Sequence, residues 1–452
     1  MTDRAQLVPL IGALAKARVL CVGDVMLDHF HYGTVDRISP EAPIPVLKVE
    51  REDAMLGGAG NVVRNLRSLG AQARFITVVG KDGAGKEIAR QIRDHGVADK
   101  PIVDNGRRTS TKTRYLAGGQ QVLRADRETD HPLSPKVEKK LIRAATSAMR
   151  GCKVVVLSDY GKGVLTGKVA AEIIKIARQA KKTVIVDPKG ADFSRYRGAG
   201  LITPNLRELA EATGKAVETD RDVTAAAKHL IRKHKLGAVL VTRSADGMTV
   251  VPAKGRAVHL AAESQEIFDV SGAGDTVVAA IATALGAGIP LADAAALANV
   301  AAGIVVGKVG TAVADAADVI ARLHHQDLSS AEAKVLSAQQ VEDRVAAWRR
   351  AGHKIGFTNG CFDLLHPGHV SLLRQAKRAC GRLVVGLNSD ASVAGQKSDG
   401  RPVQSEAARA TVVARLGVTP EVTLEGGGYR RRSGGPGCRP YVGQGWAPGP
   451  CF

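Results

Sequence analysis

The sequence predicts an α/β protein, and three observations support this fold class. Between residue 18 and about residue 320, short runs of β-branched residues alternate with segments of helical periodicity, which is typical of a mostly parallel sheet. The 452 residues are enough for two or three domains with full-sized cores. Hydrophobic residues make up 44% and charged residues 24%, as expected of a globular chain. The expected strands and intervening helices are Val19–Val22, Ala73–Val79, Val154–Leu157, Thr183–Val186, Leu201–Thr203 and Ala238–Thr242, with Ala59–Leu69 and Val169–Ala180 as helices.

Charge and composition argue against several functional classes. The formal charge of +20 would suit nucleic acid, but Lys and Arg are scattered along the chain without interleaved aromatic residues. We therefore expect phosphorylated small molecules rather than a nucleic-acid partner. The six cysteines show no CxxC or metal-ligand spacing, which indicates a reducing cytosol. The longest uncharged apolar stretch, 277–292, contains two glycines and a proline and is too short for a membrane span, so we expect a cytoplasmic protein without a membrane partner.

Two kinds of segment in the first 130 residues add detail to this fold. Apolar residues of Leu7–Leu14 recur at helical spacing without a basic segment before them, which favours an amphipathic helix over a signal peptide. The segments Tyr32–Glu50 and Thr109–Asp126 read as extended pieces that could form a small β lid over the edge of the sheet. Such a lid would exclude water from a site at that edge.

The segment Gly80–Lys86 matches the GxxxxGK half of a phosphate-binding P-loop, and it follows a strand and precedes a helix. The next residue is Glu87, where the motif needs a Ser or Thr hydroxyl, and a carboxylate there would repel phosphate. We therefore interpret this segment as a turn followed by an acidic helix start.

A stronger candidate for an anion site is the octapeptide Asp269–Thr276. Gly272, Ala273 and Gly274 allow backbone N–H groups to approach an anion, and the apolar helix that follows directs its N-terminus at the same point. Asp275 would then accept the proton of an acceptor hydroxyl during phosphoryl transfer. The alternative is an ordinary glycine-rich loop with Asp275 as a helix N-cap.

Four segments, in this order, resemble the signatures of the ribokinase-like (PfkB) carbohydrate kinases: Gly57–Asn61, Thr203–Glu208, Val241–Gly247 and Asp269–Thr276. The resemblance implies a doubly wound sheet with a small β lid. It also implies that Asp275 is the catalytic base and that Gly272, Ala273 and Gly274 form the anion hole.

The same resemblance implies sites for ATP and Mg²⁺. Glu208 is a hard oxygen donor suited to Mg²⁺, and Asn205 supplies a neutral donor beside phosphate oxygens. The alternative for these two residues is a turn paired with the first turn of a helix. The residues implied in nucleotide binding are Asn205, Leu206, Arg207, Glu208, Thr242, Ser244 and Gly247.

Within that family, the chain resembles the heptose-phosphate kinases of bacterial lipopolysaccharide synthesis. The resemblance is carried by Gly23–Asp28, Arg37–Pro43, Thr111–Arg114, Gln120–Asp126, Leu157–Gly163 and Asp187–Phe193. It implies a heptose phosphate substrate and a homodimer formed through the β lid. By analogy, the residues that would hold sugar hydroxyls are Asp24 or Asp28, Gly57, Gly58 and Asn61. The candidate cations for the substrate's phosphate are Lys112, Arg114, Arg124 and Lys189, each with a solvated surface role as the alternative.

A second domain begins after a segment without a strong apolar face. Gly352–Asp363 reads as a strand and turn, and His366 and His369 lie three residues apart at the start of a helix. No third ligand with zinc spacing follows, so we expect no metal there. The pattern resembles the HxGH signature of cytidylyltransferase-like nucleotidyltransferases, in which the histidines stabilise phosphate charge. The implied nucleotidyltransferase residues are Thr358, Asn359, Gly360, Phe362, His366, Gly368, His369 and Lys397.

The predicted organisation is a kinase domain over 1–325, a linker over 326–340, a partial nucleotidyltransferase domain over 341–425 and a tail over 426–452. The tail is rich in Gly, Pro and Arg and contains no acidic residue, so we expect it to be disordered. The resemblance to nucleotidyltransferases ends near Gly417, which suggests a frameshift or truncation, with a natural basic tail as the alternative. The second domain is accordingly expected to be an incomplete Rossmann-like domain.

The whole chain resembles the bifunctional heptose 7-phosphate kinase and heptose 1-phosphate adenylyltransferase enzymes. The expected first reaction phosphorylates O1 of a heptose 7-phosphate with ATP, and the expected second reaction, impaired by the tail, joins heptose 1-phosphate to AMP. Two alternatives stay open at this point. One is a PfkB kinase for another sugar or a nucleoside, and the other is a basic nucleotide- or nucleic-acid-binding module.

Overall fold

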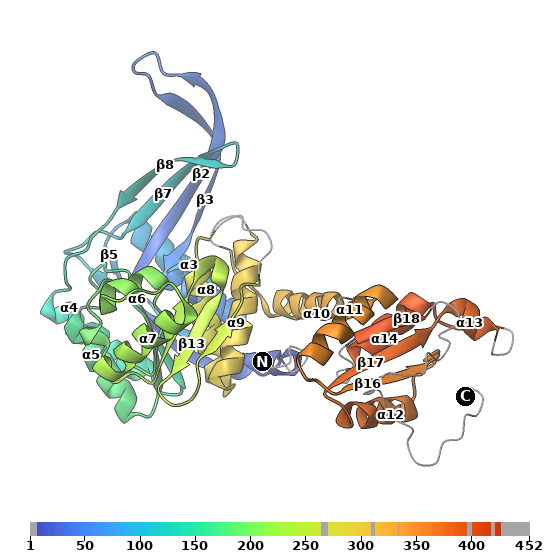
Figure 1. The fold of residues 1–452 in the computed structure, drawn as a ribbon. Helices are drawn as coiled ribbons and strands as arrows, with labels where there is room; N and C mark the ends of the chain where they lie inside the picture. The colour runs from blue at the N-terminus through green and yellow to red at the C-terminus, as the bar shows by residue number, and fades with distance from the viewer. Residues whose placement is uncertain are drawn as a thin grey trace. The chain divides into compact units, whose positions relative to one another are not determined.

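The chain folds into two compact units, Met1–Arg322 and Leu323–Phe452, in a computed structural model. The structure describes residues 7–263, 270–308, 312–332, 334–395, 400–416 and 421–425. No described helix combines the length and apolar composition needed to cross a lipid bilayer. Each unit is built around its own β-sheet (Figure 1).

An eight-stranded sheet forms the centre of the first unit, in the order β14-β13-β12-β11-β10-β9-β1-β4. The strands from β4 to β12 run parallel, while β13 and β14 are antiparallel to their neighbours. The predicted strand Ala73–Val79 is divided, because Val78–Gly80 leaves this sheet as β5 and pairs with β6 (Ile102–Asp104). The strands are β1 Arg18–Gly23, β4 Gln72–Ile76, β9 Val154–Ser158, β10 Thr183–Asp187, β11 Leu201–Ile202, β12 Ala238–Thr242, β13 Met248–Pro252 and β14 Val258–Leu260.

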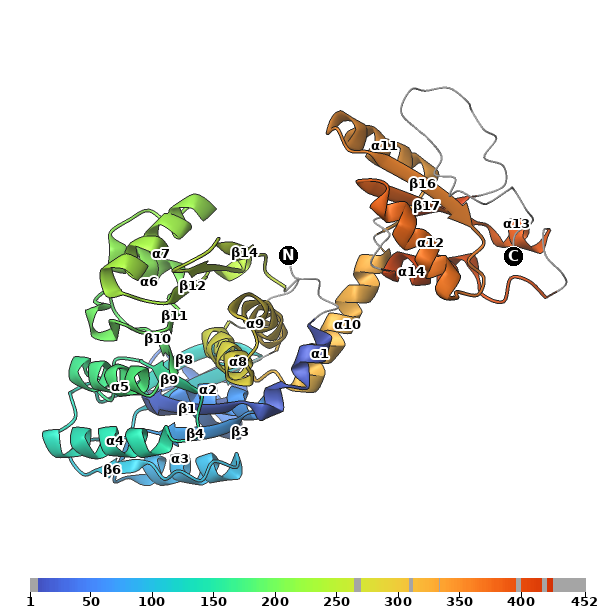
Figure 2. The ribbon, with the colours of Figure 1, turned by 90° about the horizontal axis from the view of Figure 1, so that it is seen from below.

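Helices cover both faces of this sheet, which explains why its central strands are apolar throughout (Figure 2). All five residues of β9 are buried, for example. One core cluster joins alternate residues of the parallel strands to α4 (Pro135–Ala148), α5 (Gly167–Gln179) and α7 (Asp220–His234). The opposite face is covered by α2 (Ala59–Ser68), α8 (Ala273–Ala287) and α9 (Leu291–Val306). This arrangement confirms the predicted doubly wound α/β fold.

Local sequence signals begin the helices on the first face. Ser134, Thr166 and Thr219 are the N-caps of α4, α5 and α7, and each side chain accepts a hydrogen bond from a backbone N–H of the first turn. At the N-terminus, the predicted amphipathic helix is shorter than expected. It consists of α1 (Val8–Ile11) and a 3₁₀ turn, η2 (Leu14–Lys16), with Leu7, Ile11 and Leu14 buried.

A four-stranded sheet, in the order β3-β2-β7-β8, projects from the first unit as the lid (Figure 1). Its strands are β2 (Val25–Ile38), β3 (Pro45–Gly58), β7 (Thr111–Ala117) and β8 (Gln120–Arg127). The lid begins earlier than the predicted Tyr32, because β2 continues almost directly from β1. Its inner end therefore brings strand residues next to the carboxyl ends of the parallel strands.

The P-loop-like segment is closed by Asp82, which caps α3 (Gly83–Asp94). Asp82 Oδ1 accepts from the Gly85 N–H at 2.8 Å and from the Thr109 hydroxyl at 2.7 Å, and Oδ2 accepts from the Thr109 N–H at 2.8 Å. A carboxylate thus occupies the Gly85 N–H, which a P-loop would offer to phosphate, while Lys86 is exposed. The segment is therefore the start of a helix, and the hydrogen bonds between Asp82 and Thr109 connect it to the loop that leads into β7.

The second unit contains a parallel four-stranded sheet in the order β15-β18-β17-β16. The predicted linker over 326–340 differs from this structure, because α10 (Ala316–Glu332) extends into it and β15 (Val335–Leu336) pairs with β18. The apolar pair of β15 thus belongs to the second sheet. The tail over 426–452 lies outside the described residues. The other elements are α11 Ala338–Arg350, β16 Ile355–Gly360, α12 Pro367–Arg378, β17 Arg382–Asn388, α13 Asp390–Ala394, α14 Glu406–Arg415 and β18 Glu421–Glu425.

Replacement of Asp82 by alanine should destabilise the first unit by about 2 kcal/mol, since it removes an N-cap and the bonds to Thr109. Lys86→Ala is the matched control and should change stability by less than about 0.5 kcal/mol, because this side chain is exposed. Urea unfolding of both variants measures the difference. Equal stabilities would show that Asp82 does not hold the loop.

Candidate active site

Asp275 lies in the first turn of α8, with only 6% of its surface exposed. Its carboxylate oxygens accept hydrogen bonds from Asn61 Nδ2, at 2.9 Å, and from the Tyr160 hydroxyl. Burial raises the pKa of Asp275 to about 6; these hydrogen bonds oppose the increase, Asp28 adds to it and Arg64 opposes it. A carboxyl group with a pKa close to neutral pH is suited to act as a general base.

The turn before α8 leaves room for an anion at the helix N-terminus. Gly272 adopts a φ of +81°, which favours glycine. A Cβ at Gly274 would meet no atom within 4 Å, so the space beside it is open. The Ala273 N–H makes a long bond of 3.3 Å to the Val270 carbonyl. The positive end of the helix therefore faces an open space, as the anion-hole prediction requires. Asp269 lies outside the described residues.

Asp24 positions the loop that carries Tyr160, and its predicted role in sugar binding is corrected by the structure. Its side chain is fully buried. Oδ2 accepts from the N–H groups of Tyr160 at 2.8 Å and Lys162 at 3.1 Å, and Oδ1 accepts from the Val164 N–H at 3.0 Å. The carboxylate has no surface left for a sugar hydroxyl. The sequence analysis did not identify Tyr160, although it follows the carboxyl end of β9, where ligands of parallel sheets bind.

Asn61 also makes contacts within the protein. Its side chain is fully buried, donates to Asp275 and accepts from Arg64 Nη1 at 3.3 Å. Arg64 was missed by the sequence analysis. It lies three residues after Asn61 on α2, so helical spacing places both side chains on one face. Asn61 therefore orients Asp275, and its contact with a sugar stays a prediction.

Asp28 remains a candidate for sugar binding. It is 3% exposed and accepts a hydrogen bond from Arg114 Nη1 at 2.9 Å. A Cβ at Gly57 would lie 2.2 Å from Asp28 Oδ2, so only glycine permits this approach of the strands. Gly58 has a φ of +58°, and a Cβ there would lie 2.7 Å from the Asp24 carbonyl oxygen. Both glycines are thus required by packing, and their contact with sugar stays a prediction.

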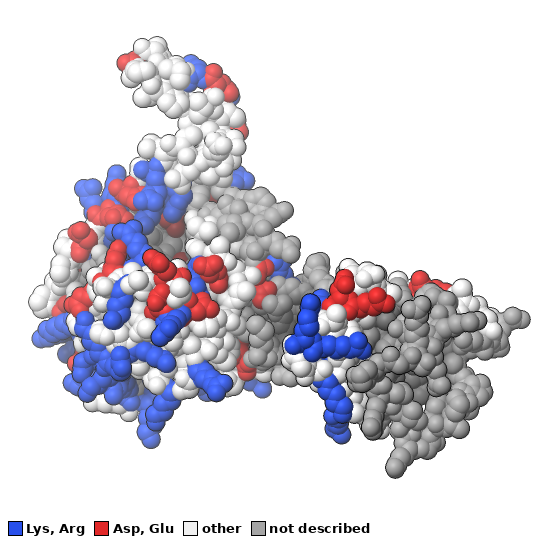
Figure 3. Space-filling model, viewed as in Figure 1, with Lys and Arg blue, Asp and Glu red and all other residues white. Residues whose placement is uncertain are grey.

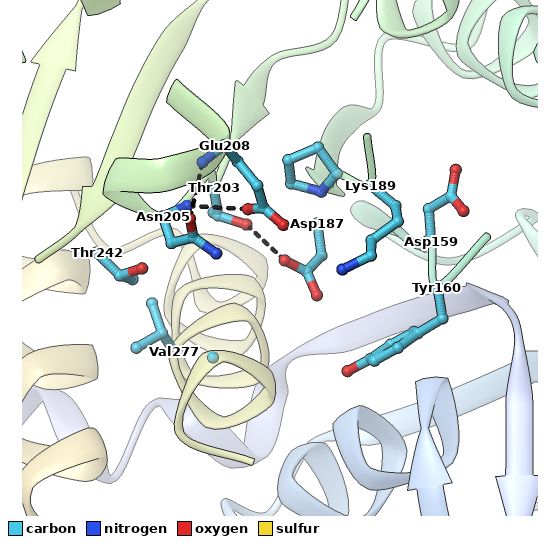
Figure 4. Close-up of a pocket in the computed structure, with 11 residues that line it drawn as sticks. Asp159, Tyr160, Asp187, Lys189, Thr203, Asn205, Glu208, Thr242 and Val277 are labelled. Carbon is cyan, nitrogen blue, oxygen red and sulfur yellow. Dashed lines mark hydrogen bonds between the residues drawn. The ribbon is translucent and has the colours of Figure 1, made fainter. Parts of the chain in front are cut away.

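A cavity of about 170 Å³ opens beside the N-terminal turn of α8. Its lining comes mainly from segments at the carboxyl ends of the parallel strands, and the polar side chains point into a common space (Figure 4). It brings together four predicted site residues, Asn205, Glu208, Thr242 and Lys189, with Gly274 of the anion-hole prediction. The other residues that line it are Asp159, Tyr160, Asp187, Pro188, Thr203 and Val277.

Asn205 and Glu208 form a capping box at the start of α6 (Leu206–Thr213). Asn205 Oδ1 accepts from the Glu208 N–H at 2.9 Å, and Glu208 Oε2 accepts from the Asn205 N–H at 3.0 Å. The alternative of a turn paired with a helix start therefore describes their hydrogen bonds, while both side chains still line the cavity (Figure 4). Capping and ligand binding are compatible here.

Four other residues predicted to bind the nucleotide do not line this cavity. Leu206 packs against the core, and Arg207 pairs with Glu211 at 2.7 Å on the exposed face of α6, so their contact with a nucleotide stays a prediction. Ser244 is exposed and Gly247 is buried in the turn after β12. A Cβ at Gly247 would lie 2.1 Å from the Leu260 carbonyl oxygen, which gives this glycine a packing role.

The predicted phosphate-binding cations lie on two sides of the site. Lys112 and Arg114 of β7 are partly buried, while Arg124 of β8 is exposed and pairs with Asp126 at 3.0 Å. Arg114 and Arg124 are register partners, so their side chains share one lid face. Lys189 lines the cavity instead (Figure 4).

Two carboxylates of the cavity suit a divalent cation. Burial raises the pKa of Asp187 well above its ordinary value, and the charges of Asp275 and Glu208 raise it further. Burial also raises the pKa of Glu208. No group of three His, Cys, Asp or Glu side chains is arranged for a metal within the described ranges. Asp187 and Glu208 therefore fit a cation that arrives with phosphates and water as further ligands.

In the second unit, the two histidines of the HxGH pattern lie together at the start of α12. Nδ1 of His366 accepts from the Gly368 N–H at 3.2 Å, and the ring centroids of His366 and His369 are 3.9 Å apart. A Cβ at Gly368 would lie 2.9 Å from the His366 ring. The buried Phe362 ring lies 5.2 Å from that of His369. Thr358, Asn359 and Gly360 end β16 nearby, whereas Lys397 lies outside the described residues.

A charged network around the turn between β16 and α12 was not found from the sequence. Arg409 is fully buried and donates to the Cys361 carbonyl at 2.6 Å and to Asp390 Oδ1 at 2.5 Å. Asp363 accepts from Arg401 Nη1 at 2.7 Å and from the Val403 N–H at 2.7 Å. Such contacts join segments 19 to 48 residues apart, so no local pattern indicates them.

Comparison with known proteins agrees with both halves of this description. The model of the pfkB family carbohydrate kinases matches residues 16–317, and the cytidylyltransferase-like model matches residues 357–427. The second match continues past Gly417, so the predicted end of the resemblance was about ten residues too early. This agrees with β18, which adds a strand beyond that point.

Two solved structures share the fold of the first unit. Phosphofructokinase-2 from Escherichia coli in complex with potassium has a TM-score of 0.60 at 20% identity, covering 68% of this chain and 99% of its own. Ribokinase from Arabidopsis thaliana, complexed with ribose and ATP, has a TM-score of 0.53 at 20% identity, covering 68% and 98%. These similarities confirm the predicted ribokinase-like architecture.

Curated relatives extend over nearly the whole chain. The bifunctional protein HldE of Paramagnetospirillum magneticum is 56% identical over 427 residues, which cover 94% of this chain and 88% of the relative. The HldE protein of Rhodospirillum rubrum is 56% identical over 417 residues, with coverage of 92% and 84%. The chain therefore belongs to the family of bifunctional HldE proteins, as an enzyme with a pfkB family carbohydrate kinase domain followed by a cytidylyltransferase-like domain.

Proposed function

We propose that the first unit transfers the γ-phosphoryl group of ATP to O1 of D-glycero-D-manno-heptose 7-phosphate, and that the second unit adenylylates heptose 1-phosphate to ADP-heptose. These are cytoplasmic steps in the synthesis of lipopolysaccharide core precursors. Membership of the HldE family supports this assignment. The observation that carries the first activity is the buried carboxylate of Asp275 at the N-terminus of α8, beside the cavity.

Asp275 accepts the proton of the anomeric hydroxyl while O1 forms its bond to the γ-phosphorus and the bond to ADP breaks. Tyr160 and Asn61 hold the carboxylate in place by donating to its two oxygens. Burial and the charge of Asp275 raise the pKa of Tyr160 well above its ordinary value, so its phenol stays protonated and remains a donor. The N-terminus of α8 stabilises the charge that develops on the transferring group.

We propose Mg²⁺ as the divalent cation, with Glu208 and Asp187 as the residues that hold it together with the nucleotide phosphates. When bound, this cation neutralises charge on the phosphates during transfer. Lys189 lines the same cavity and adds a positive charge beside them. The chemistry of these donors, two carboxylates and no nitrogen or sulfur ligand, favours a hard cation such as Mg²⁺ over Zn²⁺ or Cu²⁺.

We further propose that two copies of the chain associate through the lid. Apolar side chains are exposed on the lid, with Ile38 at the end of β2 at 60%, Ile44 in the connection to β3 at 57% and Leu123 of β8 at 58% of their surface. Exposed apolar groups gathered on one element mark protein interaction surfaces. Pairing of two lids would remove these side chains from water.

Asp275→Asn should lower the turnover of heptose 7-phosphate-dependent ADP release by roughly 10² to 10⁴, the usual contribution of a general base. ATP binding should persist, because Asn keeps the size of the side chain. The matched control is Glu172→Gln on the exposed side of α5, which should retain full activity. Near-normal turnover in the Asp275 variant would remove this residue from the role of base.

The rate of the kinase should depend on the protonation of Asp275. Its folded-state pKa of about 6 means that the base is lost as pH falls through 6, so kcat/KM should decline about tenfold per pH unit below that value and level off above about pH 7. The 7-phosphate of the substrate also ionises near pH 6. The residual activity of Asp275→Asn isolates that second effect, and identical profiles for both proteins would contradict the assignment.

The second activity should be weak relative to the first. The composition of residues 426–452 cannot build a core that completes a transfer site. On one preparation, we expect robust ADP release with heptose 7-phosphate and little pyrophosphate release from ATP and heptose 1-phosphate. His366→Ala should abolish any pyrophosphate release and leave ADP release unchanged. Robust pyrophosphate release from the intact chain would overturn this expectation.

A further inference from the structure

Glu128 is the first residue after β8, and its carboxylate lies between two lysines. Oε2 accepts from Lys162 Nζ at 2.5 Å, and Oε1 lies 3.8 Å from Lys112 Nζ. The three side chains are 31%, 18% and 20% exposed, respectively. In Figure 3, Lys and Arg side chains lie beside acidic ones where the lid meets the body of the first unit. A single carboxylate therefore bridges two ammonium groups at the edge of solvent.

The two lysines are connected by strand register and by sequence to two residues of the kinase site. Lys112 of β7 is the register partner of Asp28, the remaining carboxylate candidate for sugar binding. Lys162 follows two residues after Tyr160, whose hydroxyl contacts Asp275. A heptose carries C1 and C7 at opposite ends. With its O1 at Asp275, its other end would extend towards this lysine pair.

The backbone of the two lysines is held more firmly than that of Glu128. The Lys162 N–H donates to Asp24 Oδ2 at 3.1 Å, and the Lys162 carbonyl accepts from Arg107 Nη1 at 3.1 Å. Lys112 lies within the ladder of β7, between β2 and β8. Glu128, in contrast, follows the last register pair of β8, so rotation of its side chain into water disturbs no strand pairing.

We propose that Glu128 occupies a phosphomonoester subsite formed by Lys112 and Lys162, and that the phosphate of the sugar displaces it on binding. A phosphomonoester carries a charge of about −1.5 to −2 at pH 7 and three acceptor oxygens, whereas a carboxylate carries −1. Exposed ion pairs are weak, so the exchange of one anion for the other is readily reversible. The subsite selects phosphorylated over neutral sugars.

This inference rests on the proposed heptose 7-phosphate kinase activity and adds Lys162 and Glu128 to its specificity. A different role for Glu128 would be a permanent tie between lid and body, since Lys162 belongs to the loop after β9. The two roles predict opposite effects of removing the negative charge of Glu128. Loss of the negative charge improves phosphate binding if Glu128 competes with it, and impairs catalysis if Glu128 holds the lid.

The kinetic test uses Glu128→Gln in the full chain. We expect a roughly two- to fivefold lower KM for heptose 7-phosphate, from the loss of competing exposed ion pairs, with kcat unchanged. Lys162→Ala should raise that KM roughly tenfold or more. The control Glu52→Gln removes the ion pair with His31 (3.3 Å) on the opposite lid face and should change neither constant. A KM for Glu128→Gln equal to or above the wild-type value would overturn the proposal.

A binding test separates this proposal from the proposed function. Inorganic phosphate is titrated calorimetrically in the presence of ADP, which fills the nucleotide site. Phosphate should bind more tightly to Glu128→Gln than to the wild type and more weakly to Lys162→Ala. If the kinase assignment fails, the wild type lacks heptose 7-phosphate-dependent ADP release whatever this titration shows. If ADP release is normal but phosphate affinity is the same in all three proteins, the subsite proposal alone is wrong.

Discussion

The enclosed carboxylate of Asp24 is the contact on which the kinase site depends. It accepts three backbone N–H groups of the loop after β9, and this loop carries both Tyr160 and Lys162. Burial and the neighbouring Asp159 raise its pKa, while the three hydrogen bonds lower it. A buried carboxylate is stable only when such donors replace water, so the loop conformation and the charge at this position support each other.

Two residues of that loop, Tyr160 and Lys162, contact different parts of the site. Tyr160 reaches the catalytic carboxylate of Asp275, which α8 places beside the nucleotide cavity. Lys162 reaches Glu128 at the base of the lid. The loop after β9 therefore connects the base that activates one end of the sugar to the cations proposed for its other end. A change in loop position would alter catalysis and substrate selection together.

The cavity concentrates negative charge that a substrate complex must balance. Burial raises the pKa of Asp187, Glu208 and Asp275, and the charges of Asp275 and Glu208 raise the pKa of Asp187 further. Without a cation, this cluster would oppose binding of the polyphosphate of a nucleotide. A divalent cation bound with ATP offsets this repulsion, and Lys189 contributes from the cavity wall. In the first unit, the cavity proposed for the nucleotide therefore carries acidic residues, whereas the subsite proposed for the sugar phosphate carries Lys112 and Lys162.

The sequence by itself determined the alternation of strands and helices and the order of the glycine-rich motifs, because strand periodicity and turn chemistry are local properties of the chain. It also located Asp275, whose neighbours in sequence form its helix N-terminus. Only the tertiary structure assigned Asp24 to a loop 136 residues away, Asn61 to a carboxylate 214 residues away and Arg409 to the loop before the histidine pair. Such pairings depend on which distant segments the fold brings together at one edge of a sheet, and no local pattern in a single sequence indicates these contacts.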